Sequence, residues 1–160
     1  MGSSALDLSV CISGISGGGG SGDGKSIRQS ITQLSHGFTT GDVVYFDAGT
    51  ATYKKAKADS ATTSAVIGVV ETASTDIFTV VYQGYINLSG ISGVSITGGS
   101  TYYLSDSTAG KLTPTAPLST SGSVILPLFV ATSSTLGIVV NSLQADPNTV
   151  TLYTPVGTLS

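Results

Sequence analysis

The Gly-rich stretch near the N-terminus holds the residues with the most recognisable chemical spacing. Residues 19–26 fit the pattern G-x-x-x-x-G-K-[ST]. In that pattern backbone N–H groups hold phosphates, the Lys reaches the β- and γ-phosphates and the Ser binds Mg²⁺. A Gly-rich segment meets the pattern easily by chance, and no later alternation of strands and helices supplies the parallel sheet on which such a loop sits. We therefore expect a linker here, with nucleotide binding through Lys25 and Ser26 as the less favoured interpretation.

The other groups suited to catalysis or metal binding are isolated in the sequence. Cys11 and His36 are the only residues of their types, which excludes an intramolecular disulfide and a zinc site of the usual Cys and His kind. His36 lies in a His-Gly-Phe turn, and Glu71 is the only Glu, so no facing carboxylate pair of a glycosidase can be identified. Most Asp residues stand beside Gly, Ser or Thr, where they cap turns. We expect no catalytic, cofactor-binding or metal-binding residue.

Tyrosines and lysines leave two interpretations open. The seven tyrosines fit a sugar-binding platform, or, as we favour, residues at the edge of a core whose hydroxyls reach water. Lys54, Lys55 and Lys57 fit contacts with an acidic patch on a capsid, or a solvated strand face that protects a sheet edge.

Composition narrows the class of protein. Only 9% of the residues are charged, against about 25% in an ordinary domain, so the surface must be built from hydroxyls and small residues. Such a surface suits extracellular β-proteins and viral particle proteins that pack against copies of themselves. The net charge of −3 gives no electrostatic footprint for nucleic acid. The start of the chain has no signal-peptide pattern and no apolar run is long enough to span a membrane, so we expect synthesis in a reducing cytoplasm and no membrane partner.

The densest run of β-branched and aromatic residues predicts the centre of the fold. Residues 66–71 and 77–88 are two such runs, separated by a polar break of hairpin length. We predict a central antiparallel hairpin whose second arm bends at Gly84, because an isolated Gly in a strand marks a bulge or a close backbone approach. Both runs are apolar on both faces, so both faces should be covered.

Short strands with turn signals recur along the rest of the chain, and no convincing helix appears. We predict strands over 43–47, 52–58, 101–105, 111–113, 123–126, 128–131 and 136–141, with Pro127 at an edge or bulge. Residues 26–34 fit a strand or a helix. The predicted fold class is all-β: a compact β-sandwich or barrel of short antiparallel strands.

The patterns at both ends of the chain predict extended arms. Residues 5–16 alternate, with apolar side chains at Leu6, Leu8, Val10 and Ile12, and are followed by a flexible Gly-rich linker. The tail at 148–155 alternates again, with Val150 and Leu152 apolar. The predicted organisation is an arm and linker over 1–24, a β-domain over 25–141 and a C-terminal extension over 142–160. A tethered amphipathic strand makes sense as an arm that docks on a neighbouring subunit.

Several motifs carry a family resemblance over about residues 30–141. They are TQLSHGFTTGDVVY at 32–45, KAKADS at 55–60, VIGVVE at 66–71, FTVV at 78–81, GYI at 84–86, YYLS at 102–105 and GKLT at 110–113, with Pro127 and Ala-Thr-Ser at 131–133. Together they resemble a module of structural proteins of tailed bacteriophages, including cyanophages, found in tail-fibre segments and in small capsid decoration (cement) proteins. The resemblance implies a homotrimer and no enzymatic activity.

Length favours one member of that class. Fibres usually carry such a module in a longer chain with a shaft, and this sequence of 160 residues has no heptads. We therefore expect a decoration protein on the capsid surface of a virion. It would bind the major capsid protein and itself, using the apolar positions of both arms and Lys54, Lys55 and Lys57 as contacts. The alternative is a tail-fibre or appendage segment that recognises host polysaccharide.

Overall fold

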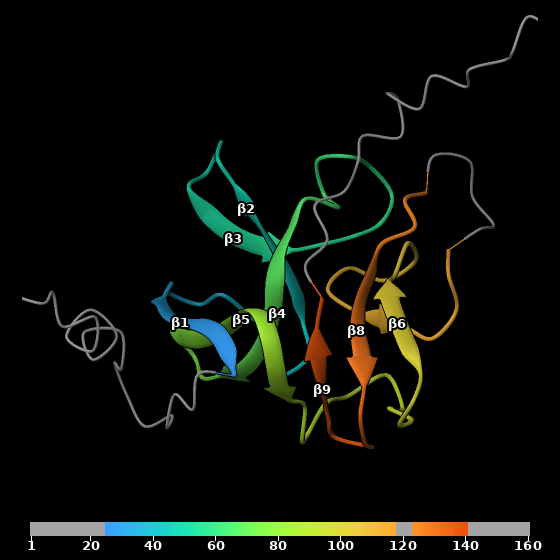
Figure 1. The fold of residues 1–160 in the computed structure, drawn as a ribbon. Helices are drawn as coiled ribbons and strands as arrows, with labels where there is room; N and C mark the ends of the chain where they lie inside the picture. Colours follow the sequence, from blue (N-terminus) through green and yellow to red (C-terminus); the bar gives the residue numbers. More distant parts are fainter. Residues whose placement is uncertain (1–24, 118–122, 141–160) are drawn as a thin grey trace, which may run out of the picture.

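The structure is a computed structural model, and it describes residues 25–117 and 123–140. Nine strands form one antiparallel sheet, and these residues contain no helix, so the all-β prediction is confirmed (Figure 1). The strands are β1 (Ser26–Thr32), β2 (Val43–Asp47), β3 (Thr52–Lys55), β4 (Val66–Ala73), β5 (Ile77–Asn87), β6 (Thr101–Leu104), β7 (Leu112–Thr113), β8 (Pro127–Ala131) and β9 (Leu136–Val139).

Strand β5 is the hub of the sheet, as the dense apolar run predicts. The first part of β5 pairs with β4 across the short connection at 74–76, which confirms the central hairpin. Strand β1 pairs along β5 as far as Gly84, and β9 pairs with residues 84–87. The order along the sheet is β3-β2-β4-β5-β9-β8-β6-β7, with β1 on β5 as a branch. The strand alternative for residues 26–34 is therefore correct.

Gly84 marks the point where β5 changes partners. It lies opposite Ser26 on one side and Val139 on the other, with φ at 98°. A methyl group there would overlap the carbonyl oxygen of Lys25, and a positive φ is strained for any residue with a Cβ. The close backbone approach predicted for Gly84 is confirmed, although the register shift between β1 and β5 lies just before it, opposite Ile27 and Arg28.

The sheet curls into a half-barrel, and irregular backbone closes the side where β2 and β3 approach the β6–β7 turn. Val43 donates to the carbonyl of Gly110 at 2.9 Å, and Gly110 donates to Ala56 at 2.7 Å. Ala58 donates to Ser105 at 2.9 Å. Residues 56–58, which we predicted as the end of a strand, thus lie beyond β3 and connect the two ends of the sheet. The structure is therefore closer to the predicted barrel than to the predicted sandwich.

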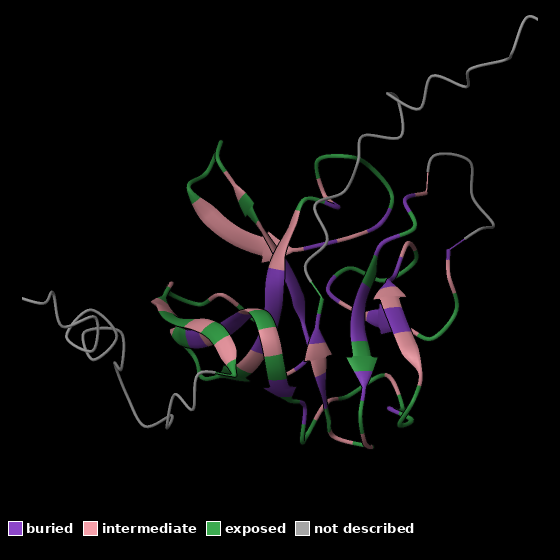
Figure 2. Cartoon of the chain, in the orientation of Figure 1, coloured by how far each residue is buried: buried purple, intermediate pink, exposed green. Residues whose placement is uncertain are grey.

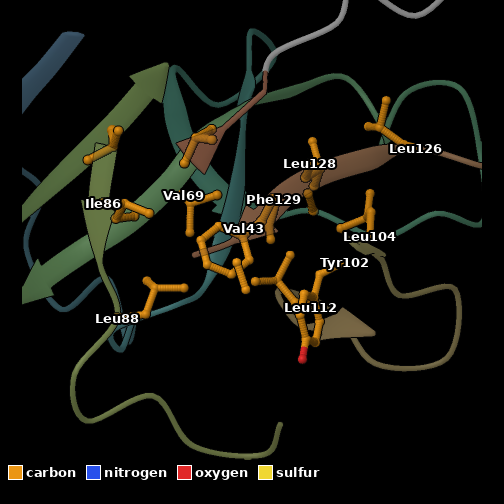
Figure 3. Packing of buried hydrophobic residues seen from close by; sticks show 14 of the residues in the cluster. Val43, Val69, Ile86, Leu88, Tyr102, Leu104, Leu112, Leu126, Leu128 and Phe129 are labelled. Carbon is orange, nitrogen blue, oxygen red and sulfur yellow. The ribbon is translucent and has the colours of Figure 1, made fainter. Parts of the chain in front are cut away.

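Two apolar clusters cover the two faces of the central hairpin, as its pattern predicts. The larger cluster fills the inside of the curl, with Val69 and Val81 from the hairpin and Tyr102 and Phe129 from β6 and β8 (Figure 3). The smaller cluster packs on the opposite face. Its buried members are Phe38, Val44, Val70, Phe78 and Val80.

The C-terminal part of the described chain follows the prediction at Pro127 and differs from it at residues 123–126. Pro127 begins β8 at a register shift against Tyr102 and Tyr103, which confirms its place at a bulge. Residues 123–126 form no strand, although Leu126 accepts a hydrogen bond from Leu104 at 3.0 Å. The two arms, residues 1–24 and 142–160, lie outside the described residues.

Candidate functional site

An apolar outer face of the sheet is a surface suited to binding. Across three neighbouring strands, Tyr85 of β5 lies opposite Ile138 of β9, and Ile138 lies opposite Val130 of β8. Directly opposed residues point to the same side of a sheet, so these three side chains form one row. Tyr85 is 46% exposed and Val130 is 36% exposed. We call this row, with Leu136 and Val140 of the β9 segment, the outer face.

The strand pattern explains why the outer face is apolar and exposed while the side chains between its members are buried. Successive side chains of a strand point to opposite faces. Gly137 and Val139 of β9, and Phe129 and Ala131 of β8, therefore turn into the core, where all four are buried. Both strands carry buried and more exposed positions (Figure 2). They alternate along β9, whereas in β8 Leu128 is buried beside Phe129, and Pro127 and Val130 are exposed. Strands β5, β6, β8 and β9 contain no charged residue, and the Arg28 guanidinium, which is paired with Glu71, lies beside the outer face at the carbonyl of Tyr85.

Most charged side chains of the described residues lie in or beside β1 to β4, and five ion pairs form among them and Lys111. The most buried of them is Asp42, whose side chain is fully inaccessible. Its carboxylate lies 2.7 Å from the Lys111 ammonium and 3.1 Å from the Lys55 ammonium, and it accepts the Thr39 N–H at 2.9 Å. These contacts join the start of β2, the end of β3 and the β6–β7 turn, so they hold the closing side of the half-barrel.

A second polar network joins β1, β4 and β5 near Gly84. Arg28 donates to the carboxylate of Glu71 at 2.7 Å and to the carbonyl of Tyr85 at 3.3 Å. Glu71 also accepts the N–H of Asn87 at 3.1 Å. Glu71 therefore holds the sheet together where β5 changes partners.

The three lysines predicted as capsid contacts each pair with an aspartate of their own chain. Lys54 binds Asp47, Lys55 binds Asp42, and Lys57 lies 2.9 Å from Asp59. Hydrogen bonds from Lys54 and Thr50 lower the pKa of Asp47 to about 2, and hydrogen bonds from Thr63 and Lys57 lower the pKa of Asp59. The ammonium groups are thus used inside the chain, and contact with a capsid stays a prediction.

The structure does not support the phosphate-binding interpretation of Lys25 and Ser26, because no helix begins at these residues. In that motif the Lys and Ser open a helix whose N-terminal N–H groups face the phosphates. Here Ser26 begins strand β1, and its hydroxyl accepts hydrogen bonds from the Arg28 guanidinium. Residues 19–24 lie outside the described part of the chain.

His36 has the turn role predicted for it. Its Nδ1 accepts the N–H of Phe38 at 2.9 Å. The ring stacks on Phe38 and meets the edge of Phe78, with centroids 4.9 and 4.8 Å apart. His36 therefore orders the loop over the smaller cluster.

The tyrosines do not gather on one surface of the described chain. Tyr53 and Tyr82 pack on the smaller cluster and Tyr45 on the larger one. Tyr102 is buried, and its hydroxyl donates to Ser95 O at 2.9 Å. Tyr85 lies on the outer face, so a position at the edge of a core is seen for Tyr45, Tyr53 and Tyr82.

The remaining predicted contacts cannot be placed. The predicted contacts of the two arms lie outside the described residues; they are Leu6, Leu8, Val10, Ile12, Val150 and Leu152.

Within residues 25–117 and 123–140 no three His, Cys, Asp or Glu side chains gather as metal ligands would. No helix in the same ranges has the length and apolar character to cross a membrane.

Sequence reasoning missed the outer face and the central role of Asp42. The signal for the outer face was present in the alternation of Leu136, Ile138 and Val140, but their neighbours are Gly and Val, so the segment reads as apolar on both sides. The signal for Asp42 was absent, because its partners lie 13 and 69 residues away and pairing depends on closure of the sheet.

The fold and site define an all-β module with an internally neutralised body and an apolar outer face. Comparison of the chain with protein-family models, with curated proteins and with solved structures finds no match.

Proposed function

We propose that the chain is a capsid decoration protein, a non-enzymatic homotrimer that binds the major capsid protein on the outside of a phage shell. The observation that carries the proposal is the uncharged outer face on a body whose ion pairs are internal. Five of the six Lys and Arg residues bind carboxylates of their own chain. Association with other proteins therefore rests on apolar and hydroxyl contacts, which suits a protein that packs among copies of itself.

In this proposal the outer face and the N-terminal arm have different roles. The outer face serves assembly of the trimer, and the alternating arm at 5–16 reaches the shell or a neighbouring subunit. A short flexible tether holds an arm at an effective concentration in the millimolar range, so a weak contact becomes a stable one. The phage-module motifs support the class of protein.

The experiment tests the arm in the full-length protein on purified shells of the phage that encodes it. A Leu8→Asp and Val10→Asp double variant places charges on the apolar parity of the arm. The matched control is Ser9→Asp, which adds a charge to the same segment on the other parity. We expect the double variant to stay folded and to bind shells at least tenfold more weakly, and Ser9→Asp to bind like the wild type. Wild-type binding by the double variant would contradict the arm model.

The tail-fibre alternative has one favourable observation. Tyr85 presents an exposed ring on the outer face, and aromatic rings are a common platform for sugars. Saccharide binding that Tyr85→Ala abolishes, without binding to shells, would favour the appendage.

A further inference from the structure

We infer that the outer face is the docking site for the C-terminal segment of a neighbouring copy, residues 148–155, with Val150 and Leu152 packed against Ile138 and Val130. The inference rests on the proposed homotrimer and names the surface that would hold it together.

The position where the described chain ends supports this occupant. Val140 continues the pairing with β8, since its N–H donates to Leu128 O at 2.8 Å, and its side chain is 42% exposed on the outer face. Twenty further residues follow it. The nine residues 141–149 span roughly 30 Å when extended, about the width of a small domain, so Val150 reaches an adjacent copy.

The chemistry of the segment matches the chemistry of the face. Residues 147–160 contain no charged side chain, and neither do the strands that carry the outer face. Packing the two together therefore buries no unpaired charge, because Arg28 at the edge of the face is already paired with Glu71. Val150 and Leu152 are spaced by two, which in an extended segment places both side chains on the side that meets the sheet.

Symmetry explains why a neighbour is the partner that we assign. Each copy offers one outer face and supplies one segment from the strand beside it. In a closed ring every face then receives the segment of the next copy, and no apolar face is left over. A ring of three satisfies the proposed homotrimer.

The test is a cysteine cross-link in the full-length chain, with Cys11→Ser as the background. One chain carries Leu152→Cys, and a second, distinguished by a size tag, carries Ile138→Cys; the two are co-expressed and treated with a short bismaleimide. We expect a cross-linked heterodimer, and at least fivefold less of it when Thr151→Cys, on the other parity, replaces Leu152→Cys. Equal yields from positions 151 and 152 would overturn the assigned parity.

A second arrangement of the same residues decides between a neighbour and the chain itself. Both cysteines are placed in one chain. A product that stays at the mass of one chain, with no heterodimer in the mixed experiment, means that the segment folds on its own sheet and overturns the inference. No cross-link in either arrangement overturns docking altogether.

Shell binding of the same proteins separates this inference from the proposed function. A heterodimer that forms in a protein with no affinity for shells keeps the docking site and rejects decoration. Shell binding without the heterodimer keeps decoration and rejects the docking site.

Discussion

The two halves of the sheet differ in where their charged side chains lie and in what those side chains bind. In the half built from β1 to β4, charged side chains are present but are bound within the chain, at Asp42 and at Glu71. In the half built from the end of β5 with β9, β8 and β6, the strands carry no charged side chain, and the outer face is apolar. The first half uses charge to close its own fold. The second half keeps an apolar surface whose strands bring no charged side chain to a contact with another protein.

The largest expected effect comes from comparing neighbouring residues on opposite faces of β8. Phe129 is fully buried against Gly137, whereas Val130 lies on the outer face. Phe129→Ala should cost about 3–5 kcal/mol of unfolding free energy, because it removes a ring from a packed core. Val130→Ala should cost about 0.5 kcal/mol or less. Urea unfolding in dilute solution measures both, and similar costs would mean that the outer face is part of the core.

The next largest effect on stability is expected from replacing Asp42, whose carboxylate is buried. Asp42→Ala leaves two ammonium groups without a partner, but both lysine side chains are partly exposed and can turn to water. We therefore expect a loss of about 3 kcal/mol, at the low end for a broken buried pair. The matched variant is Asp47→Ala, which breaks an exposed pair with Lys54 and should change the melting temperature little. Equal losses in the two variants would remove the special role of the Asp42 contacts.

A smaller effect is expected from alkaline pH in the half that contains Tyr82. Burial, with a hydrogen bond to Tyr53, raises the pKa of Tyr82 from 10.0 to about 12. The folded state then keeps a proton that the unfolded state releases above pH 10, so this contribution to stability is complete below pH 10 and is lost as pH rises towards about 12. Unfolding of Tyr82→Phe should show a weaker decline over this range than the wild type. Identical declines would show that Tyr82 titrates as in the unfolded chain.

The smallest effect is expected from salt. Screening weakens contacts between charged groups and leaves apolar contacts unaffected or slightly stronger. Self-association through the outer face, measured by sedimentation, should therefore not weaken between low and high NaCl. A Val130→Lys variant should associate more weakly at every salt concentration. If salt dissociated the wild type, the interface would have to lie in the charged half of the sheet.

The sequence predicted most of the backbone and little of the site. The hairpin over 66–88 and the close backbone approach at Gly84 follow from local residue types, because β-branched runs and an isolated Gly act within a few positions. The direction of curl, and hence which face of β9 is exposed, depends on pairing between distant strands. Asp42 shows the same limit, since a turn aspartate and a buried ion-pair centre look alike until Lys55 and Lys111 are brought beside it.

The measurement that tests the central claim most directly is the number of copies of this chain in each purified virion, by quantitative mass spectrometry against the major capsid protein. A decoration protein occupies symmetry-related positions over the whole shell, so we predict copies on the order of hundreds. A handful of copies, or a few dozen, would place the chain in a tail appendage and contradict the account.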